Sequence, residues 1–96
     1  MPNRAYVRGR SAEYRAIARL RRLNFLCIRS AGSHGPADLI AASPDRERFV
    51  IQVKSGKAKA TDQERIELKF VASRFEATAQ IWTFKPRARD PLIETL

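Results

Sequence analysis

Three polar residues in the middle of the chain have the types and the spacing of a chemical site. Asp38 follows a loop rich in Gly, Ser and Pro, and Gln52 and Lys54 lie two residues apart in the apolar stretch RFVIQVKS. Residues two apart in a strand project from the same face, so Gln52 and Lys54 point together. Each feature alone also has an ordinary explanation, because a strand-end Asp often caps a turn and one face of an antiparallel strand is often solvated. Together, an acid followed by Gln-x-Lys on adjacent strands indicates a face that opens onto a site.

Glu13 is a fourth candidate. It falls on the apolar side of an amphipathic helix predicted from Ser11, as N-cap, to about Leu23. The apolar residues of that side are Ala12, Ala16, Ile17, Leu20 and Leu23. A carboxylate on the core-facing side of a helix is costly unless something pairs with it or binds it. Glu13 therefore bridges to an arginine, is a helix-terminus glutamate favoured by the helix dipole, or belongs to the site.

The helices and strands that must position these residues are predicted from the apolar periodicity and from the capping and turn residues between the periodic segments. Strands are predicted at 25–30, 37–43, 48–55 and 79–84, and a second helix runs from the Thr61/Glu64 capping box to about Phe75. The third strand alternates cleanly, with Phe49, Ile51 and Val53 on one face. Residues 1–10 are interpreted as a basic N-terminal arm, and in the tail 86–96 the segment LIETL could add a short edge strand. The expected fold class is α/β, α-β-β-β-α-β, a mixed sheet flanked by helices in one domain of residues 1–96.

Charge and composition limit the classes of molecule that the protein is expected to bind. Nineteen Lys and Arg against ten Asp and Glu give a net charge of +9, which favours a polyanion bound through its phosphates. The 44% hydrophobic content excludes a disordered basic tail. No apolar run could cross a bilayer or serve as a signal core, and the single Cys27 suits a buried position in a reducing cytoplasm, so we expect a cytoplasmic protein. Charge does not separate DNA from RNA, or an enzyme from a scaffold.

The arrangement of these residues resembles the PD-(D/E)xK nuclease superfamily. More narrowly, SAEYRAIARLRRLNFLCIRSAGSHGPADLIA and the strand up to Lys54 are similar to the archaeal-type Holliday junction resolvases, which have a helix Glu, an Arg-Ser strand end, a Gly/Ser loop, an Asp and an acid-x-Lys in this order. The likeness continues more loosely through SRF and QIWTF and covers about three quarters of the chain. It implies a restriction-endonuclease-like core. The positions that match the family pattern are Glu13, Arg29, Ser30, Ser33, Asp38, Gln52 and Lys54.

The resemblance implies an Mg²⁺-dependent endonuclease, with Mn²⁺ as a possible substitute, that resolves four-way DNA junctions in recombination and repair. Asp38 would be the principal metal ligand, with Glu13 and Gln52 as further ligands, since Mg²⁺ prefers oxygen donors. Lys54 would orient the attacking water or stabilise the charge on the phosphoryl group. Ser33 would join this catalytic set beside the metal.

One departure from the family pattern concerns position 52, where the family usually has a glutamate and this chain has Gln52. An amide oxygen can still ligate a hard cation, but it brings no charge. Three alternatives therefore stay open: another DNA nuclease of the same fold, a catalytically inert DNA-binding relative, and a basic RNA-binding structural protein in which the pattern is a coincidence.

Further residues are candidates for contacts to DNA phosphates. Ser30 could equally serve turn chemistry, Arg29 could pair with Glu13, and the lone His34 does not make a zinc site. The basic residues could equally be solvated surface charge. The predicted DNA-binding residues are Arg4, Arg8, Arg10, Arg29, Ser30, His34, Lys57 and Lys59. No small-molecule cofactor and no membrane partner are expected.

The second helix raises the question of assembly. It carries two apolar stripes, one of Leu68, Val71, Ala72 and Phe75, the other of Ile66 and Phe70. One stripe must pack on the sheet, and the other would be exposed in a monomer. We therefore expect a homodimer, which also suits the two-fold symmetry of a four-way junction. The pattern leaves open which stripe faces the partner.

Overall fold

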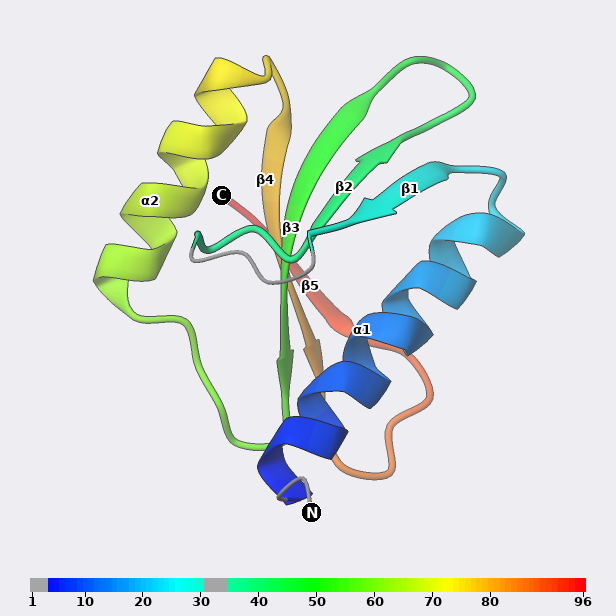
Figure 1. Cartoon of the computed structure of the whole chain (residues 1–96), viewed down its shortest axis with the longest axis vertical. Helices are drawn as coiled ribbons and strands as arrows, with labels where there is room; N and C mark the ends of the chain where they lie inside the picture. Colours follow the sequence, from blue (N-terminus) through cyan, green and yellow to red (C-terminus); the bar gives the residue numbers. More distant parts are fainter. Residues whose placement is uncertain (1–3, 31–34) are drawn as a thin grey trace.

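The fold is a five-stranded mixed sheet between two helices (Figure 1). A computed structural model describes residues 4–30 and 35–96 of the chain, with side chains from residue 11 onward. The elements in chain order are α1 (Arg4–Arg22), β1 (Leu26–Arg29), β2 (Leu39–Ala42), β3 (Arg48–Ser55), α2 (Asp62–Arg74), β4 (Thr78–Phe84) and β5 (Leu92–Thr95). The predicted order α-β-β-β-α-β is confirmed, and the LIETL segment supplies the additional strand β5.

The strands lie in the order β1-β2-β3-β4-β5 across the sheet. The pairs β1–β2, β2–β3 and β4–β5 are antiparallel, whereas β3 and β4 are parallel and are connected through α2. A parallel pair needs such a crossover, because a tight hairpin joins only antiparallel strands. The strand β3 therefore lies in the middle of the sheet, with both faces available for packing.

The helices cover opposite faces of the sheet and create two cores (Figure 1). On the α1 side, Ile51 of β3 is fully buried with Leu20 of the helix, and Phe49 and Val53 pack against this cluster. On the α2 side, Val50 is buried with Leu68. The predicted alternation of β3 is thus confirmed. It turns Gln52 away from the α1 core and toward the start of α2.

The start of α1 differs from the prediction. The helix begins at Arg4 rather than Ser11, so residues 4–10 are helical and not an arm, and Ser11 lies inside the helix instead of capping it. Arg and Ala are strong helix formers, and the single Gly9 costs only about 1 kcal/mol, so helical propensity extends beyond the amphipathic pattern. An apolar periodicity marks the part of a helix that packs on a core and does not report where the helix begins.

The end of α1 is a left-handed cap that leaves Leu23 outside the helix. Asn24 has φ of 64°, and the N–H of Phe25 donates to the carbonyl of Leu20 at 3.0 Å, as in a Schellman motif. The side chain of Leu23 is 55% exposed, so its predicted place on the packed side of the helix is wrong.

The helix α2 begins as its capping box predicts and settles which stripe packs on the sheet. Thr61 caps the helix and Glu64 closes the box. Leu68 and Ala72 are buried, whereas Ile66 and Phe70 are more than 60% exposed. Phe75, predicted in the packed stripe, is 51% exposed because it follows the last helical residue.

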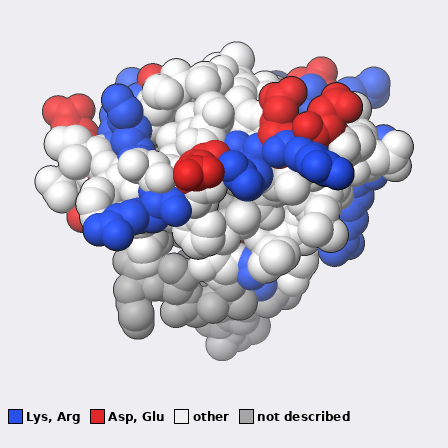
Figure 2. Space-filling model, turned by 90° about the horizontal axis from the view of Figure 1, so that it is seen from above, with Lys and Arg blue, Asp and Glu red and all other residues white. Residues whose placement is uncertain are grey.

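The surface carries charges of both signs. Figure 2 shows acidic and basic side chains next to one another on the face seen from above, rather than in separate patches. Cys27 in β1 is half-buried against the α1-side core, and burial raises the pKa of its thiol. Among the described residues, no helix is long and apolar enough to cross a membrane.

Candidate active site

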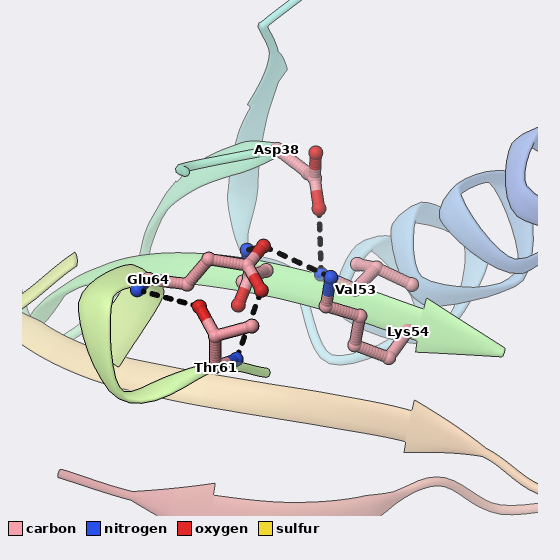
Figure 3. A network of polar contacts seen from close by, with 6 residues as sticks. Asp38, Val53, Lys54, Thr61 and Glu64 are labelled. Atoms are coloured by element: carbon pink, nitrogen blue, oxygen red, sulfur yellow. Dashed lines mark hydrogen bonds and ion pairs between the residues drawn. The ribbon is translucent and has the colours of Figure 1, made fainter. Parts of the chain in front are cut away.

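Asp38 lies at the start of β2, where backbone hydrogen bonds hold it from both neighbouring strands. Its N–H donates to the carbonyl of Ile51 at 2.9 Å, and its carbonyl accepts from the N–H of Ser30 at 2.9 Å. The carboxylate Oδ2 accepts a hydrogen bond from the N–H of Val53 at 2.7 Å (Figure 3). For the other carboxylate oxygen, Oδ1, no hydrogen bond is formed within residues 4–30 and 35–96. The Asp38 carboxylate is therefore anchored to the backbone of β3 through Oδ2.

Gln52 and Lys54 share one acceptor. The Gln52 Nε2 donates to Oε2 of Glu64 at 2.8 Å, and the Lys54 Nζ donates to the same oxygen at 3.0 Å. Gln52 is only 4% exposed, and its Oε1 is buried with no hydrogen-bond partner in the described part of the chain. A buried carbonyl oxygen without a protein partner is rare and destabilising, so the expected partner of the Gln52 Oε1 is a water molecule or a bound ligand.

Glu64 is the site residue that sequence reasoning missed, since it was interpreted only as the closing residue of the capping box. Its Oε1 accepts from the N–H of Thr61 at 2.9 Å, while its Oε2 faces Gln52 and Lys54 (Figure 3). The Thr61 N–H, followed by the Lys54 ammonium and the Gln52 amide, lowers the pKa of Glu64 to about 2. The available signal was the short connection 56–61, which brings the first turn of α2 back to the strand that carries Lys54.

The surroundings of Asp38 raise the pKa of its carboxyl group. Burial is the main cause that raises its pKa, and the carboxylates of Glu13 and Glu64 raise it further. The Val53 N–H and the Lys54 ammonium act in the opposite direction without cancelling the rise. The carboxylates of Glu13 and Glu64 are themselves paired, with Arg29 at 3.5 Å and with Lys54 at 3.0 Å. A cation bound at Asp38 would lower the pKa of this carboxyl group, because an opposite charge nearby favours its ionised form.

Glu13 approaches the site from α1 and also pairs with Arg29. Its side chain is 19% exposed, and one of its oxygens lies 3.5 Å from the Arg29 Nε. This contact is an ion pair without hydrogen-bond geometry, because the Arg29 Nε has no hydrogen-bond partner among the described residues. The Arg29 guanidinium also lies over the ring of Tyr14, at 5.5 Å from its centroid. The bridge to an arginine is therefore present, and it leaves Glu13 close enough to act on Asp38.

The donors around Asp38 fit a hard divalent cation with few protein ligands. No group of three His, Cys, Asp or Glu side chains in residues 4–30 and 35–96 is placed to hold a metal ion. Mg²⁺, however, usually keeps several waters and takes only one or two carboxylates from the protein. The Asp38 Oδ1 and the partnerless Gln52 Oε1 are oxygen donors of this kind. The chemistry of the donor set therefore suits Mg²⁺ better than a site closed by protein ligands, such as that of structural zinc.

The remaining predicted residues divide into three groups. Ser30 lies beside Asp38 through its backbone hydrogen bond, and Lys57 and Lys59 are exposed on the connection between β3 and α2. Ser33 and His34 lie outside the described residues. The backbone of three predicted phosphate-contacting residues is part of α1, and their side chains are not described: Arg4, Arg8 and Arg10.

The order and pairing of the strands, with α1 and α2 on opposite faces and Asp38 beside Gln-x-Lys, define the restriction-endonuclease-like fold. The chain is similar to Hjc, a Holliday junction resolvase from the archaeal hyperthermophile Archaeoglobus fulgidus, with a TM-score of 0.74 and 27% identity over 92% of this chain and 75% of that one. It is also similar in fold to a VRR_NUC domain, with a TM-score of 0.60 and 16% identity over 81% of this chain and 85% of the domain. No family model and no curated protein matches the sequence. The similarity to the resolvase supports a nuclease of this fold, and the similarity to the VRR_NUC domain supports the fold.

Proposed function

We propose that the protein is a divalent-metal-dependent DNA endonuclease that resolves four-way junctions, acting as a homodimer. The observation that carries this proposal is the arrangement of three residues on neighbouring strands: the Asp38 carboxylate is bonded to the backbone of β3 at Val53, and β3 carries Lys54 and Gln52, whose Oε1 is buried without a hydrogen-bond partner among the described residues. A site of this kind on a fold similar to that of a Holliday junction resolvase suits hydrolysis of a phosphodiester bond.

The residues of the site have separate roles in this proposal. The Asp38 Oδ1 and Gln52 Oε1 would hold Mg²⁺, with Glu13 as a further, water-mediated ligand. When bound, this ion supplies Lewis-acid activation of water and charge stabilisation on the phosphoryl group. The Lys54 ammonium would orient the attacking water or stabilise the charge on a phosphoryl oxygen. Arg29, held by Glu13, lies on the strand end that faces this site and binds the scissile phosphate.

Glu64 supplies the negative charge that Gln52 lacks. Its carboxylate stays ionised across the physiological range because three hydrogen-bond donors lower its pKa to about 2. It contacts the Gln52 amide and the Lys54 ammonium at the same time, and therefore orients the Gln52 Oε1 and positions the Lys54 Nζ. We assign Glu64 the role of a positioning residue.

The test is cleavage of a labelled four-way junction and of linear duplexes with the same arm sequences, in Mg²⁺ and in EDTA. The proposal expects paired nicks near the branch point that EDTA and Asp38→Asn abolish. Equal cleavage of the linear duplexes would reassign the protein to a less selective DNA nuclease. Mn²⁺ in place of Mg²⁺ tests which ion the oxygen donors accept.

A second candidate function is that of an inert junction-binding relative. It is favoured by the engagement of both Gln52 and Lys54 with Glu64, and by the absence of a three-ligand acidic group among the described residues. Tight binding of the junction without cleavage in either metal would support this candidate. In that case Gln52→Glu restores the acid, and the appearance of metal-dependent cleavage in this variant would show that one residue separates the two functions.

The outward stripe of α2 is our choice for the dimer face. Ile66 is 63% exposed and Phe70 61% exposed, while the opposite stripe packs on the sheet. Exposed apolar side chains that are neighbours on one helix are typical of an interaction surface. A two-fold pair of sites would place equivalent catalytic residues on two strands of a symmetric junction.

A further inference from the structure

A groove with basic walls runs between α1 and the connection from β4 to β5, outside the Asp38 site. It consists of two adjoining pockets of about 240 and 230 Å³, which share Arg15 and Phe84 in their walls. No acidic residue lines either pocket. Six cations line them, and we call the surface they form the α1 groove: Arg15, Arg19, Arg22, Lys85, Arg87 and Arg89.

Two arginines of α1 hold the groove together. The Arg15 guanidinium lies 4.6 Å from the centroid of the Phe84 ring and donates to the carbonyls of Ala88 and Arg89 at 2.7 and 3.1 Å. Arg19 pairs with Asp90 at 2.7 Å. These contacts attach the connection 85–91 to the outer side of the helix, so the groove has fixed walls.

The remaining charge of the groove is uncompensated. Asp90 neutralises Arg19, whereas the bonds of Arg15 to the described residues go to neutral carbonyl groups. The other four groove cations form no ion pair within residues 4–30 and 35–96: Arg22, Lys85, Arg87 and Arg89. The face shown in Figure 2 carries acidic and basic side chains together, so the groove differs from that face in being lined by one sign of charge only. A concave surface of one sign attracts an extended polyanion.

Arg87 occupies a backbone conformation that favours glycine. Pro86 and Arg87 are the central residues of a turn closed by the Ala88 N–H, which donates to the Lys85 carbonyl at 3.1 Å. Arg87 has φ of 64°, and a turn with Pro at its first central position and a left-handed second one is of type II, where glycine or asparagine is usual. A residue that keeps an unfavourable backbone conformation at the edge of a groove is often one whose side chain has a function there. Here it adds a cation to the wall.

The length and position of the groove suit one strand of a duplex. Its walls include α1 from Ser11 to Arg22, a span of about 16 Å at the helical rise. Phosphates of one DNA strand advance about 3.4 Å each along the duplex axis, so this span matches about five of them. At one end the groove reaches Ser55 and Gly56, which follow directly after Lys54. A strand seated in it would therefore run toward the end of β3.

We propose that the α1 groove binds the phosphate backbone of a duplex DNA arm, as a surface separate from the Asp38 site. The choice of DNA as the polyanion rests on the proposed function. The groove contacts backbone only, so its binding energy is independent of base sequence and falls steeply with salt. It would hold an arm of the substrate while Asp38 and Lys54 act at the cleaved bond.

The test is duplex binding by fluorescence anisotropy over a range of salt concentrations, in EDTA so that no cleavage occurs. Arg87→Gly removes one phosphate contact, which reduces the slope of log K against log salt by about 0.9 and weakens binding about eightfold at about 0.1 M salt. The pair Arg22→Gln and Arg89→Gln reduces that slope by about 1.8. Because glycine accepts a left-handed conformation, Arg87→Gly keeps or raises the melting temperature, and weaker binding cannot be ascribed to unfolding.

The chain offers a matched control for Arg87→Gly. Arg46, in the connection between β2 and β3, is also an exposed arginine with positive φ, at 71°, and it is not part of the groove. Arg46→Gly removes the same charge and relieves the same kind of backbone strain, and we expect it to leave the salt slope unchanged.

Three outcomes would overturn the proposal. Parental affinity and salt slope in Arg87→Gly and in the double variant would show that the groove does not bind DNA. An equal loss in Arg46→Gly would show that only net charge matters. Tighter binding of duplex RNA than of duplex DNA, weakened by the same groove variants, would overturn the assignment to DNA. Failure of the junction cleavage assay is a separate result, since weaker binding by the groove variants in EDTA stands without any catalysis.

Discussion

Glu64→Gln removes a charge that the fold holds ionised by three hydrogen-bond donors. The pKa of Glu64 falls from 4.5 to about 2, and at about 1.36 kcal/mol per unit this corresponds to an upper limit of about 3 kcal/mol. The side chain is 30% exposed, so solvent screening reduces the effect, and we expect a loss of about 1–2 kcal/mol in the free energy of unfolding at pH 7. Glutamine can still close the capping box through its amide oxygen. Its amide nitrogen cannot accept from Gln52 and Lys54 as the Glu64 Oε2 does, so the variant removes these two hydrogen bonds together with the charge.

The loss depends on pH in a direction that follows from the lowered pKa. The stabilisation by ionised Glu64 is complete above pH 4.5, the unfolded-state value, and disappears as the pH falls toward about 2. Denaturant unfolding of the parent and of Glu64→Gln at about pH 7, 4 and 2 measures this dependence. The difference between their free energies of unfolding should be largest at pH 7 and close to zero at the lowest pH.

Glu67→Gln is the matched control for this measurement. Glu67 is an exposed glutamate on the same helix and accepts a hydrogen bond only from the Gln63 side chain, at 3.0 Å. Its replacement should change stability by less than about 0.5 kcal/mol at any pH. A difference between parent and Glu64→Gln that is the same at neutral and acid pH would refute the reasoning, because the contribution of Glu64 would then not come from its charge.

Further predictions concern the other residues of the site and the surface of α2. Burial raises the folded-state pKa of Asp38 above its unfolded-state value of 3.8, so ionisation of the carboxyl group destabilises the fold as the pH rises through these two values. Asp38→Asn should therefore abolish cleavage yet raise the melting temperature at pH 7, with no gain at pH 3 or below, and a lower melting temperature at pH 7 would contradict this. Lys54→Ala should reduce the rate of junction cleavage about 100-fold or more with binding retained, as measured by single-turnover kinetics, and an unchanged rate would remove Lys54 from the mechanism. Replacing Ile66 and Phe70 together by serine should convert a dimer into a folded monomer in light scattering, since both side chains are exposed and do not support the core, whereas a dimer that persists would place the interface elsewhere.

Features that depend on neighbouring residues could be predicted from the sequence. The alternation along β3 separates Ile51 from Gln52 because successive side chains of a strand point to opposite faces. The Thr61/Glu64 pair marks the start of α2 because both hydrogen bonds of a capping box lie within one turn. The family resemblance rests on the same kind of short-range order, an acid and a Gln-x-Lys at a set spacing. The restriction-endonuclease-like fold that this resemblance implies is confirmed by the similarity to the resolvase structure.

Only the tertiary structure decided which residues that are distant in the chain lie next to one another. Glu64 joins the site because the crossover between the parallel strands β3 and β4 returns the start of α2 to Lys54, and the stripe with Leu68 faces the sheet for the same reason. The Glu13–Arg29 pair and the α1 groove, where Arg15 reaches carbonyls more than 70 residues away, also need the packed sheet. A sequence pattern reports periodicity and local hydrogen bonding, whereas the burial of Gln52 and the charges around Asp38 depend on which elements pack against them. The sequence therefore predicted Asp38, Gln52 and Lys54 as candidates for chemistry, and only the fold brought Glu64 to them.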